Sequence, residues 1–439
     1  MRPADLLRRP GMLRDTLTLT GGGAAAQLLT LAAMPALSRL FSPADYGIYA
    51  VYAFLVAVPS ALAAWSYEAA IPLPKDEDEA RHLVGLALTA VCITTVAAIL
   101  PLWYADAVAG ALRAPALAPW LALVPLNVFA VGIYQVLSYW HNRHTAYQGL
   151  AASRVVMSGL TAGTQFAAGT AGSGVGGLIV GQILGQLAAP LSLWRQTVRL
   201  GVDPREVLRR TVLLPLLRQY RRFPLYTGWG TIMSVGAAQM IPVLLAWFFG
   251  PAEAGLFFFG YRLVSAAVAL WTTSIGQVFY QRAARTLHEG QDLTAFVESM
   301  VVRLVRLFVL PCAAFAAVAP QFFTIVFGSA WTATGEYMRV ITPLLFLQAV
   351  TAPVSLTLFL LEKNHVAALV QLALLVGAAL SLGAAGVLHA GPRIAVLAYG
   401  TVQSVTYLVY LLIVLRAAGA SPSRILRAAT GLPRPRPAV

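Results

Sequence analysis

The chain has 439 residues, of which 59% are hydrophobic and only 11% are charged, whereas a typical soluble domain has about 25% charged residues. Its mean hydropathy of +0.73 identifies an integral membrane protein and excludes an ordinary soluble domain. The net charge of +14 would suit nucleic acid. However, the basic residues lie between apolar runs, where such residues orient membrane helices, so we expect no nucleic-acid partner.

The apolar runs predict an all-α polytopic membrane protein, because about 20 mostly apolar residues span a bilayer as a helix. Twelve candidate spans follow one another at 16–40, 46–72, 83–104, 115–140, 146–168, 173–194, 223–249, 255–281, 300–327, 334–361, 366–389 and 393–416. The predicted organisation is a basic cytoplasmic N-terminus (1–15), a six-helix N-lobe (16–194), an Arg-rich cytoplasmic linker (195–222), a six-helix C-lobe (223–417) and a disordered cytoplasmic tail (418–439).

The distribution of basic residues predicts the orientation of these spans. One set of alternate loops and adjoining helix ends, including both termini and 195–222, carries 26 of the 31 basic residues. The other set carries five, namely Arg39, Arg113, Arg262, Arg339 and Arg393. The positive-inside rule therefore places both termini in the cytoplasm. The opposite, outer loops are all short, which disfavours a membrane glycosyltransferase or polymerase with a folded site there.

An internal repeat relates the two predicted lobes. The stretch beginning at Phe41 (FSPADYGIY) returns at Phe249 (FGPAEAGLF) at a constant offset of 208, with matching proline and glycine positions. A second proline pair, Pro35 and Pro242, precedes the two copies at nearly equivalent places. Paired bundles with a site between them are typical of transporters. Because proline kinks helices, we expect the first and seventh helices to bend as counterparts during gating.

Polar residues at helical spacing indicate faces that avoid lipid. Arg154 and Gln165 share such a face on the fifth predicted helix, Arg262 lies on the eighth and Gln403 on the twelfth. These faces line a cavity or, alternatively, pack against neighbouring helices through small residues.

The arginines among these polar residues favour an anionic substrate, because the guanidinium fork pairs with two phosphate oxygens. Arg154 and Arg262 are the preferred candidates. Arg39 and Arg339 are further candidates that could instead extend to the nearer membrane interface.

Glu68 is the acidic residue that lies well within a predicted helix. It is a candidate proton or sodium site, or a gate partner for an arginine; the alternative is an interfacial carboxylate paired with Lys75 or Arg81. We expect no cofactor beyond such H+ or Na+ coupling. We expect no metal site either, because His141 and His144 have ligand spacing but no third ligand.

Two stretches resemble a known family. Residues 37–49 (LSRLFSPADYGIY) are similar to the junction of helices 1 and 2 in Wzx-type oligosaccharide flippases, which belong to the multidrug/oligosaccharidyl-lipid/polysaccharide (MOP) exporter superfamily. Residues 67–77 (YEAAIPLPKDE) resemble the exit of their second helix, although Ser66 stands where the family often has Arg. The resemblance implies a MOP/MATE-like fold, alternating access and a cationic cavity between the lobes.

The resemblance also implies a substrate: a polyprenyl-pyrophosphate-linked glycan that is flipped outward across the bacterial inner membrane for surface polysaccharide assembly. Its expected partners are that glycan, the lipid bilayer and polysaccharide polymerase or assembly proteins. Three alternatives stay open. A MATE-like drug/cation antiporter would want buried acids, a membrane glycosyltransferase or polymerase would want large outer loops, and a scaffold for assembly enzymes would work without a functional cavity.

Overall fold

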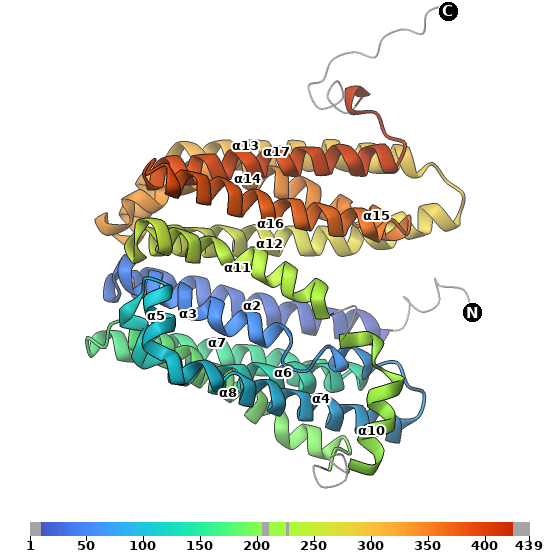
Figure 1. The fold of residues 1–439 in the computed structure, drawn as a ribbon. Coiled ribbons are helices and arrows are strands. Elements are labelled where there is room, and N and C mark those ends of the chain that lie inside the picture. The colour runs from blue at the N-terminus through green and yellow to red at the C-terminus, as the bar shows by residue number, and fades with distance from the viewer. Residues whose placement is uncertain (1–9, 204–209, 225–227, 425–439) are drawn as a thin grey trace, which may run out of the picture. The chain divides into compact units, whose positions relative to one another are not determined.

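The computed structural model describes residues 10–203, 210–224 and 228–424, and within these ranges it contains helices and no strands (Figure 1). Twelve long helices are present in the described ranges, one for each predicted span. They are α2 (Pro10–Leu40), α3 (Pro43–Ala61), α4 (Glu77–Ala97), α6 (Val124–Arg143), α7 (Tyr147–Thr170), α8 (Val175–Arg199), α11 (Gly228–Phe249), α12 (Pro251–His288), α13 (Leu293–Phe327), α14 (Thr332–Ser355), α16 (Asn364–Val387) and α17 (Pro392–Ala417).

Short elements connect the long helices. They are η1 (Tyr67–Ala70), η2 (Leu100–Tyr104), α5 (Ala105–Ala111), η3 (Pro115–Leu123), α10 (Arg210–Gln219), η5 (Ser329–Trp331) and α15 (Thr357–Leu360). By length and composition, nine segments of the described chain are suited to crossing a membrane. Helices α2, α7 and α11 are not among the nine. The first two are rich in Gly, Ser and Thr, which lowers their hydropathy.

The second predicted helix, 46–72, is interrupted in the structure, and this corrects the placement of Glu68 inside a helix. Helix α3 ends at Ala61, shortly after Pro59. The chain then turns through Trp65 and Ser66, which both have left-handed backbone angles (φ 52° and 61°), before the single turn η1 begins. Apolar side chains continue through this break, so hydropathy alone gives no sign of it.

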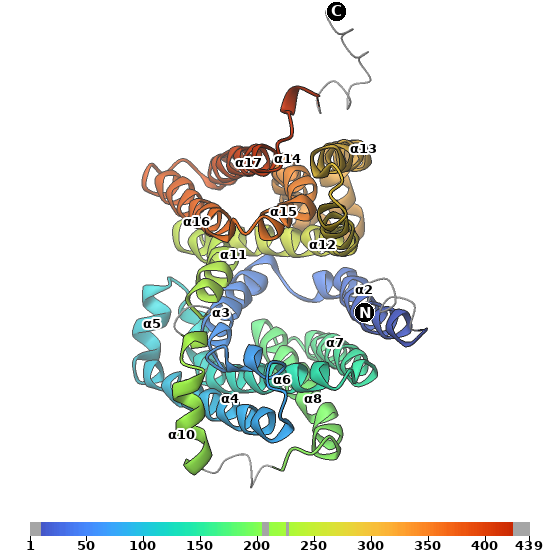
Figure 2. The same cartoon turned by 90° about the vertical axis from the view of Figure 1, so that its right-hand side faces the viewer.

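The chain forms two compact units, Met1–Gly255 and Leu256–Val439. Helix α11 belongs to the first of these units, whereas the sequence placed it in the predicted C-lobe (223–417). It packs along α3 (Figure 2), and the Arg113 Nη1 atom donates a hydrogen bond to the carbonyl of Trp247 near the end of α11 (3.1 Å).

Small residues allow close helix packing in the first unit. A Cβ on Gly22 of α2 would lie 2.3 Å from the Cβ of Ala151 on α7, and a Cβ on Gly185 of α8 would meet the side chain of Thr161 on α7. Gly22 and Gly23 therefore form a contact surface within a continuous helix, whereas Gly21 is exposed.

The two copies of the sequence repeat contact each other at the start of α3 and α12. A Cβ on Gly47 would lie 1.7 Å from the carbonyl oxygen of Pro251, and a Cβ on Gly255 would lie 1.8 Å from that of Pro43. The contact is reciprocal, since each copy places its glycine on the proline carbonyl of the other. It lies within the first unit, which includes the start of α12.

In the second unit, helices α13, α14, α16 and α17 surround an apolar core that includes Phe279, Val354 and Val414. Pro320 in α13 has no N–H, so the carbonyl of Ala316 lacks its helical donor. Arg339 of α14 replaces it, because its Nε donates to the Ala316 carbonyl (2.8 Å) and its Nη2 to the Ala317 carbonyl (3.0 Å).

Candidate functional site

A cavity of ≈ 520 Å³ lies inside the first unit and is the leading candidate for a ligand site. Segments far apart in the sequence form its wall: α3, η1, α6, α8 and α11. Its polar lining residues are Ser60, Ser66, Glu68, Gln135, Tyr139, Gln182, Gln186, Thr231 and Gln239, and its remaining lining residues are alanines and valines. The break after α3 brings Glu68 into this wall, since η1 turns back against the cavity.

Three oxygen atoms of the cavity wall are buried and form no hydrogen bond with any residue that the structure describes: Ser60 Oγ, Glu68 Oε2 and Gln186 Oε1. Most buried polar atoms in proteins are paired, so unpaired ones indicate a strained or functional place. Nearby, Gln182 accepts a hydrogen bond from the Tyr49 hydroxyl. The cavity can therefore accept hydrogen bonds from a ligand at several points.

Among the described residues that line the cavity, Glu68 is the charged one, and none of these described residues is Arg, Lys or His. Glu68 lies between the candidate spans Pro43–Ala61 and Glu77–Ala111. Burial raises the pKa of its carboxyl above the usual value. This lining does not suit a phosphate group, and the predicted arginine-rich cavity between the lobes stays a prediction.

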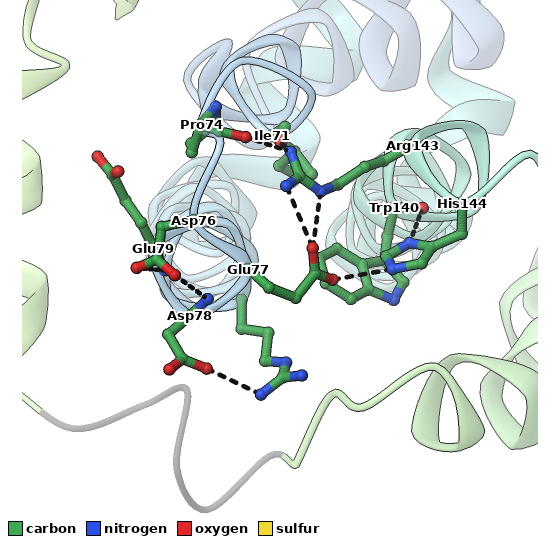
Figure 3. Close-up of polar contacts among 10 residues, drawn as sticks. Ile71, Pro74, Asp76, Glu77, Asp78, Glu79, Trp140, Arg143 and His144 are labelled. Atoms are coloured by element: carbon green, nitrogen blue, oxygen red, sulfur yellow. Dashed lines mark hydrogen bonds and ion pairs between the residues drawn. The ribbon is translucent and has the colours of Figure 1, made fainter.

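A polar network fixes the chain that leaves η1 (Figure 3). Glu77, at the start of α4, accepts hydrogen bonds on Oε2 from Nε and Nη2 of Arg143 (3.3 and 3.1 Å). Its Oε1 lies 2.9 Å from His144 Nε2. Arg143 also donates through Nη1 to the carbonyls of Ile71 (3.0 Å) and Pro74 (2.9 Å). One guanidinium thus ties the end of α6 to the loop behind the cavity.

Helix α4 also contacts the connection between α8 and α11. Glu79 Oε1 accepts hydrogen bonds from Gln219 Nε2 (2.8 Å) and from the Tyr220 hydroxyl (2.9 Å). Partial burial, followed by this contact with Glu79, raises the pKa of Tyr220 to about 12. The loops 73–82 and 141–145 and the described part of 195–222, all predicted to be cytoplasmic, therefore meet at one end of the first unit. Residues 204–209 of that connection lie outside the described residues.

Two of the predicted site residues lie in helix–helix interfaces and do not line either of the two cavities described here. Gln165 is 7% exposed and donates to the carbonyl of Leu178 on α8 (2.9 Å). Gln403 is 4% exposed and donates to the carbonyl of Leu374 on α16 (2.7 Å). The polar face of α7 is turned toward the glycines of α8, so for these residues the packing alternative describes the structure.

The four candidate arginines do not line the cavity that contains Glu68. Arg154 is half-buried on α7, and its Nη1 lies 3.2 Å from the position that a Cβ on Gly23 would occupy. Arg39 is exposed in the last turn of α2. In the second unit, Arg262 is exposed, with its guanidinium carbon 6.0 Å from the ring centre of Phe258. Arg339 borders a second cavity of ≈ 380 Å³.

That second cavity contains an ion pair, in which Arg393 Nη2 lies 2.6 Å from Glu336 Oε2.

The gating candidates Pro35 and Pro242 lie inside the continuous helices α2 and α11. Whether either helix bends during transport stays a prediction.

The sequence pattern did not identify the four glutamines that line the cavity, at positions 135, 182, 186 and 239. A usable signal existed in Gln182 and Gln186, which are one helical turn apart in an apolar helix. Within the described residues, no three His, Cys, Asp or Glu side chains are grouped closely enough to hold a metal ion.

Comparison with known proteins identifies the family. Residues 36–336 match the family model described as "Polysaccharide biosynthesis protein". The chain belongs to this polysaccharide biosynthesis family. None of the curated proteins that were compared with the chain matches it.

Solved structures show the fold. The lipid II flippase MurJ in an inward closed conformation is similar with a TM-score of 0.71 at 12% identity, covering 94% of this chain and 90% of that one. An inward-facing multidrug resistance MATE transporter of the MOP superfamily has a TM-score of 0.61 at 16% identity, with 92% and 96% covered. A MOP superfamily transporter from Pyrococcus furiosus has a TM-score of 0.59 at 17% identity, with 95% of each chain covered. The predicted all-α polytopic membrane fold is confirmed, and it is similar to the fold of these transporters.

Proposed function

We propose that this polysaccharide biosynthesis protein flips a polyprenyl-pyrophosphate-linked oligosaccharide from the cytoplasmic to the outer face of the bacterial inner membrane by alternating access. The observation that carries the proposal is the match to a polysaccharide biosynthesis family over residues 36–336 in a chain with a MOP transporter fold. Surface polysaccharides built on a lipid carrier inside the cell need a membrane step of this kind. A polysaccharide polymerase or assembly protein on the outer side is the partner that receives the product.

In this proposal the anionic pyrophosphate contacts arginines, with Arg154 and Arg262 as the leading candidates and Arg39 and Arg339 as further ones. A guanidinium pairs with two phosphate oxygens at once, which an ammonium group does not. The prenyl chain stays in lipid. Both termini lie in the cytoplasm, as the asymmetry of the basic residues favours.

The test is transport of a defined lipid. Purified protein in proteoliposomes is given a fluorescent polyprenyl-pyrophosphate oligosaccharide, and its outer-leaflet fraction is measured with an impermeant glycan-binding reagent. The flippase should equilibrate the two leaflets faster than protein-free vesicles do. A rate equal to that of the empty vesicles, from protein that is folded and correctly inserted, would refute the proposal.

A MATE-like drug/cation antiporter is the second candidate, and the buried carboxylate of Glu68 is the observation that favours it. In such a protein Glu68 would carry the coupling H+ or Na+. Substrate efflux driven by an imposed ion gradient, and lost in Glu68→Gln, would support this candidate. A membrane glycosyltransferase or polymerase would instead incorporate labelled sugar in the same vesicles.

A further inference from the structure

The charge of the lining in the cavity of the first unit bears on which ligands fit it. Glu68 is the charged residue among its described lining residues, and no described residue forms a hydrogen bond with its buried Oε2 atom. A second negative charge brought into this space would face the carboxylate in a region of low dielectric, where like charges repel strongly. The pyrophosphate of a lipid-linked glycan and an acidic sugar are both disfavoured here.

The hydrogen-bonding groups of the wall match hydroxyl-rich ligands. Ser60 Oγ, Gln186 Oε1 and Glu68 Oε2 are buried and unpaired, and each accepts a hydrogen bond. Glutamine amides also line the cavity on α6 and α11, at Gln135 and Gln239, and each such amide supplies an acceptor oxygen and two donors. A sugar hydroxyl donates and accepts, so it can satisfy both kinds of group.

The size and the remaining lining of the cavity favour a sugar over an ion. A volume of ≈ 520 Å³ lies within the range of small-molecule sites, about 300–1,000 Å³. Coordination of a small cation would need several oxygens drawn within roughly 2.3–2.6 Å of one point. Alanines and valines make up the rest of the wall and offer apolar contact to the C–H faces of a pyranose ring.

We infer that this cavity is a subsite for uncharged sugar residues of the transported glycan, and that Glu68 excludes acidic sugars from it. The inference rests on the proposed flippase function and deepens it. Gln186 and Ser60 hold the sugar hydroxyls, while the pyrophosphate is held elsewhere.

The experiment uses the full-length protein in lipid nanodiscs, because sugar-based detergents would compete. The probes are matched pairs of methyl hexosides and methyl hexuronosides of gluco, galacto and manno configuration, which differ only in the carboxylate at C6. Binding is followed by intrinsic fluorescence at neutral pH. At least one neutral hexoside should bind with millimolar affinity. Its acidic counterpart should bind with an affinity lower by a factor of roughly ten or more.

Three variants separate the roles of the groups. Gln186→Leu should lower the affinity for the neutral hexoside by a factor of roughly five or more, since a buried hydrogen bond is lost. Glu68→Gln keeps the shape of the side chain, and it should raise the affinity for the acidic hexoside close to that for the matched neutral hexoside. Gln148→Leu, an exposed glutamine on α7 outside the cavity lining, is the matched control and should change neither affinity.

Each other outcome counts against the sugar subsite. Failure of every neutral hexoside to bind, or unchanged affinities in both cavity variants, would overturn it. So would Na+-dependent stabilisation that is lost in Glu68→Gln while hexoside affinity stays the same, since the cavity would then be a cation site. If the wild type flips the lipid and these variants have no effect, the sugar subsite is refuted and the flippase function stands. If sugars bind selectively but no flipping occurs, the flippase function is refuted and the binding site stands.

Discussion

The crossing of α3 and α12 gives a sharp test of the fold, through the substitution Gly47→Ala. The added Cβ would lie 1.7 Å from the Pro251 carbonyl oxygen, and real Cβ contacts shorter than 3.0 Å are essentially absent from proteins. The two helix starts must therefore separate by at least about 1.3 Å. The obstacle is main chain, so no side-chain rotation can relieve it.

The expected cost follows from two opposing terms. Overpacking a close contact typically costs about 1–3 kcal/mol, and a backbone clash belongs at the upper end of that range. Replacing Gly by Ala within a helix returns up to about 1 kcal/mol through helix propensity. The net destabilisation is about 2 kcal/mol. Gly255→Ala, with its Cβ 1.8 Å from the Pro43 carbonyl oxygen, should cost a similar amount.

The assay is the apparent Tm of the purified protein, with Gly163→Ala as control. Gly163 is exposed on α7 with nothing within 4 Å of its Cβ, so that variant should keep or raise the Tm. Gly47→Ala and Gly255→Ala widen the same contact. The double variant Gly47→Ala/Gly255→Ala should therefore lose less stability than the sum of the losses of the two single variants. Equal Tm values for Gly47→Ala and Gly163→Ala would refute the reciprocal contact.

Four further results are expected. Arg143→Ala should lower stability by about 2 kcal/mol in thermal unfolding, since it loses bonds to two carbonyls and a carboxylate, with Arg143→Lys intermediate; equal Tm values would contradict this. Glu68→Gln should be more stable than wild type at pH 8: burial raises the pKa of the folded carboxyl above 4.5, so the penalty grows as pH rises through that value and vanishes below it. A difference in Tm that is constant with pH would count against it. Arg262→Ala should insert normally but lose flipping, with Arg262→Lys recovering part of the rate; full transport by Arg262→Ala removes the argument for this residue. A cysteine at position 110 should react with an impermeant maleimide on intact cells and one at 205 should not; the opposite pattern would reverse the topology.

Much of the helix order was predictable because hydropathy acts over one contiguous stretch at a time. Each of the twelve predicted spans corresponds to a long helix, while several ends differ, as in α12, which runs from Pro251 to His288 and not from 255 to 281. Short-range chemistry explains such differences. For example, Asp76 caps α4 by accepting from the backbone N–H groups of Asp78 and Glu79, which moves the helix start ahead of the apolar run.

The candidate site was less predictable, because its wall is assembled from α3, η1, α6, α8 and α11. Helical spacing identified polar faces such as that of Gln165, but it cannot tell a face that packs on a glycine-rich helix from one that borders a cavity. Glu68 was identified because an acidic residue is unusual within a long apolar stretch. The residues that surround Glu68 in the cavity wall could not be predicted, because their placement depends on the break at Trp65 and Ser66. These two adjacent residues adopt left-handed backbone angles that the sequence does not reveal.

The reciprocal contact between the repeat copies has a consequence for how a duplicated chain can diverge. Gly47 touches the main chain of the second copy and Gly255 touches that of the first, so a side chain added at either glycine strains both copies at once. Neither position can drift alone, whereas residues that contact only their own copy can change independently. The sequence similarity between the two copies therefore includes the glycines at which the copies contact each other.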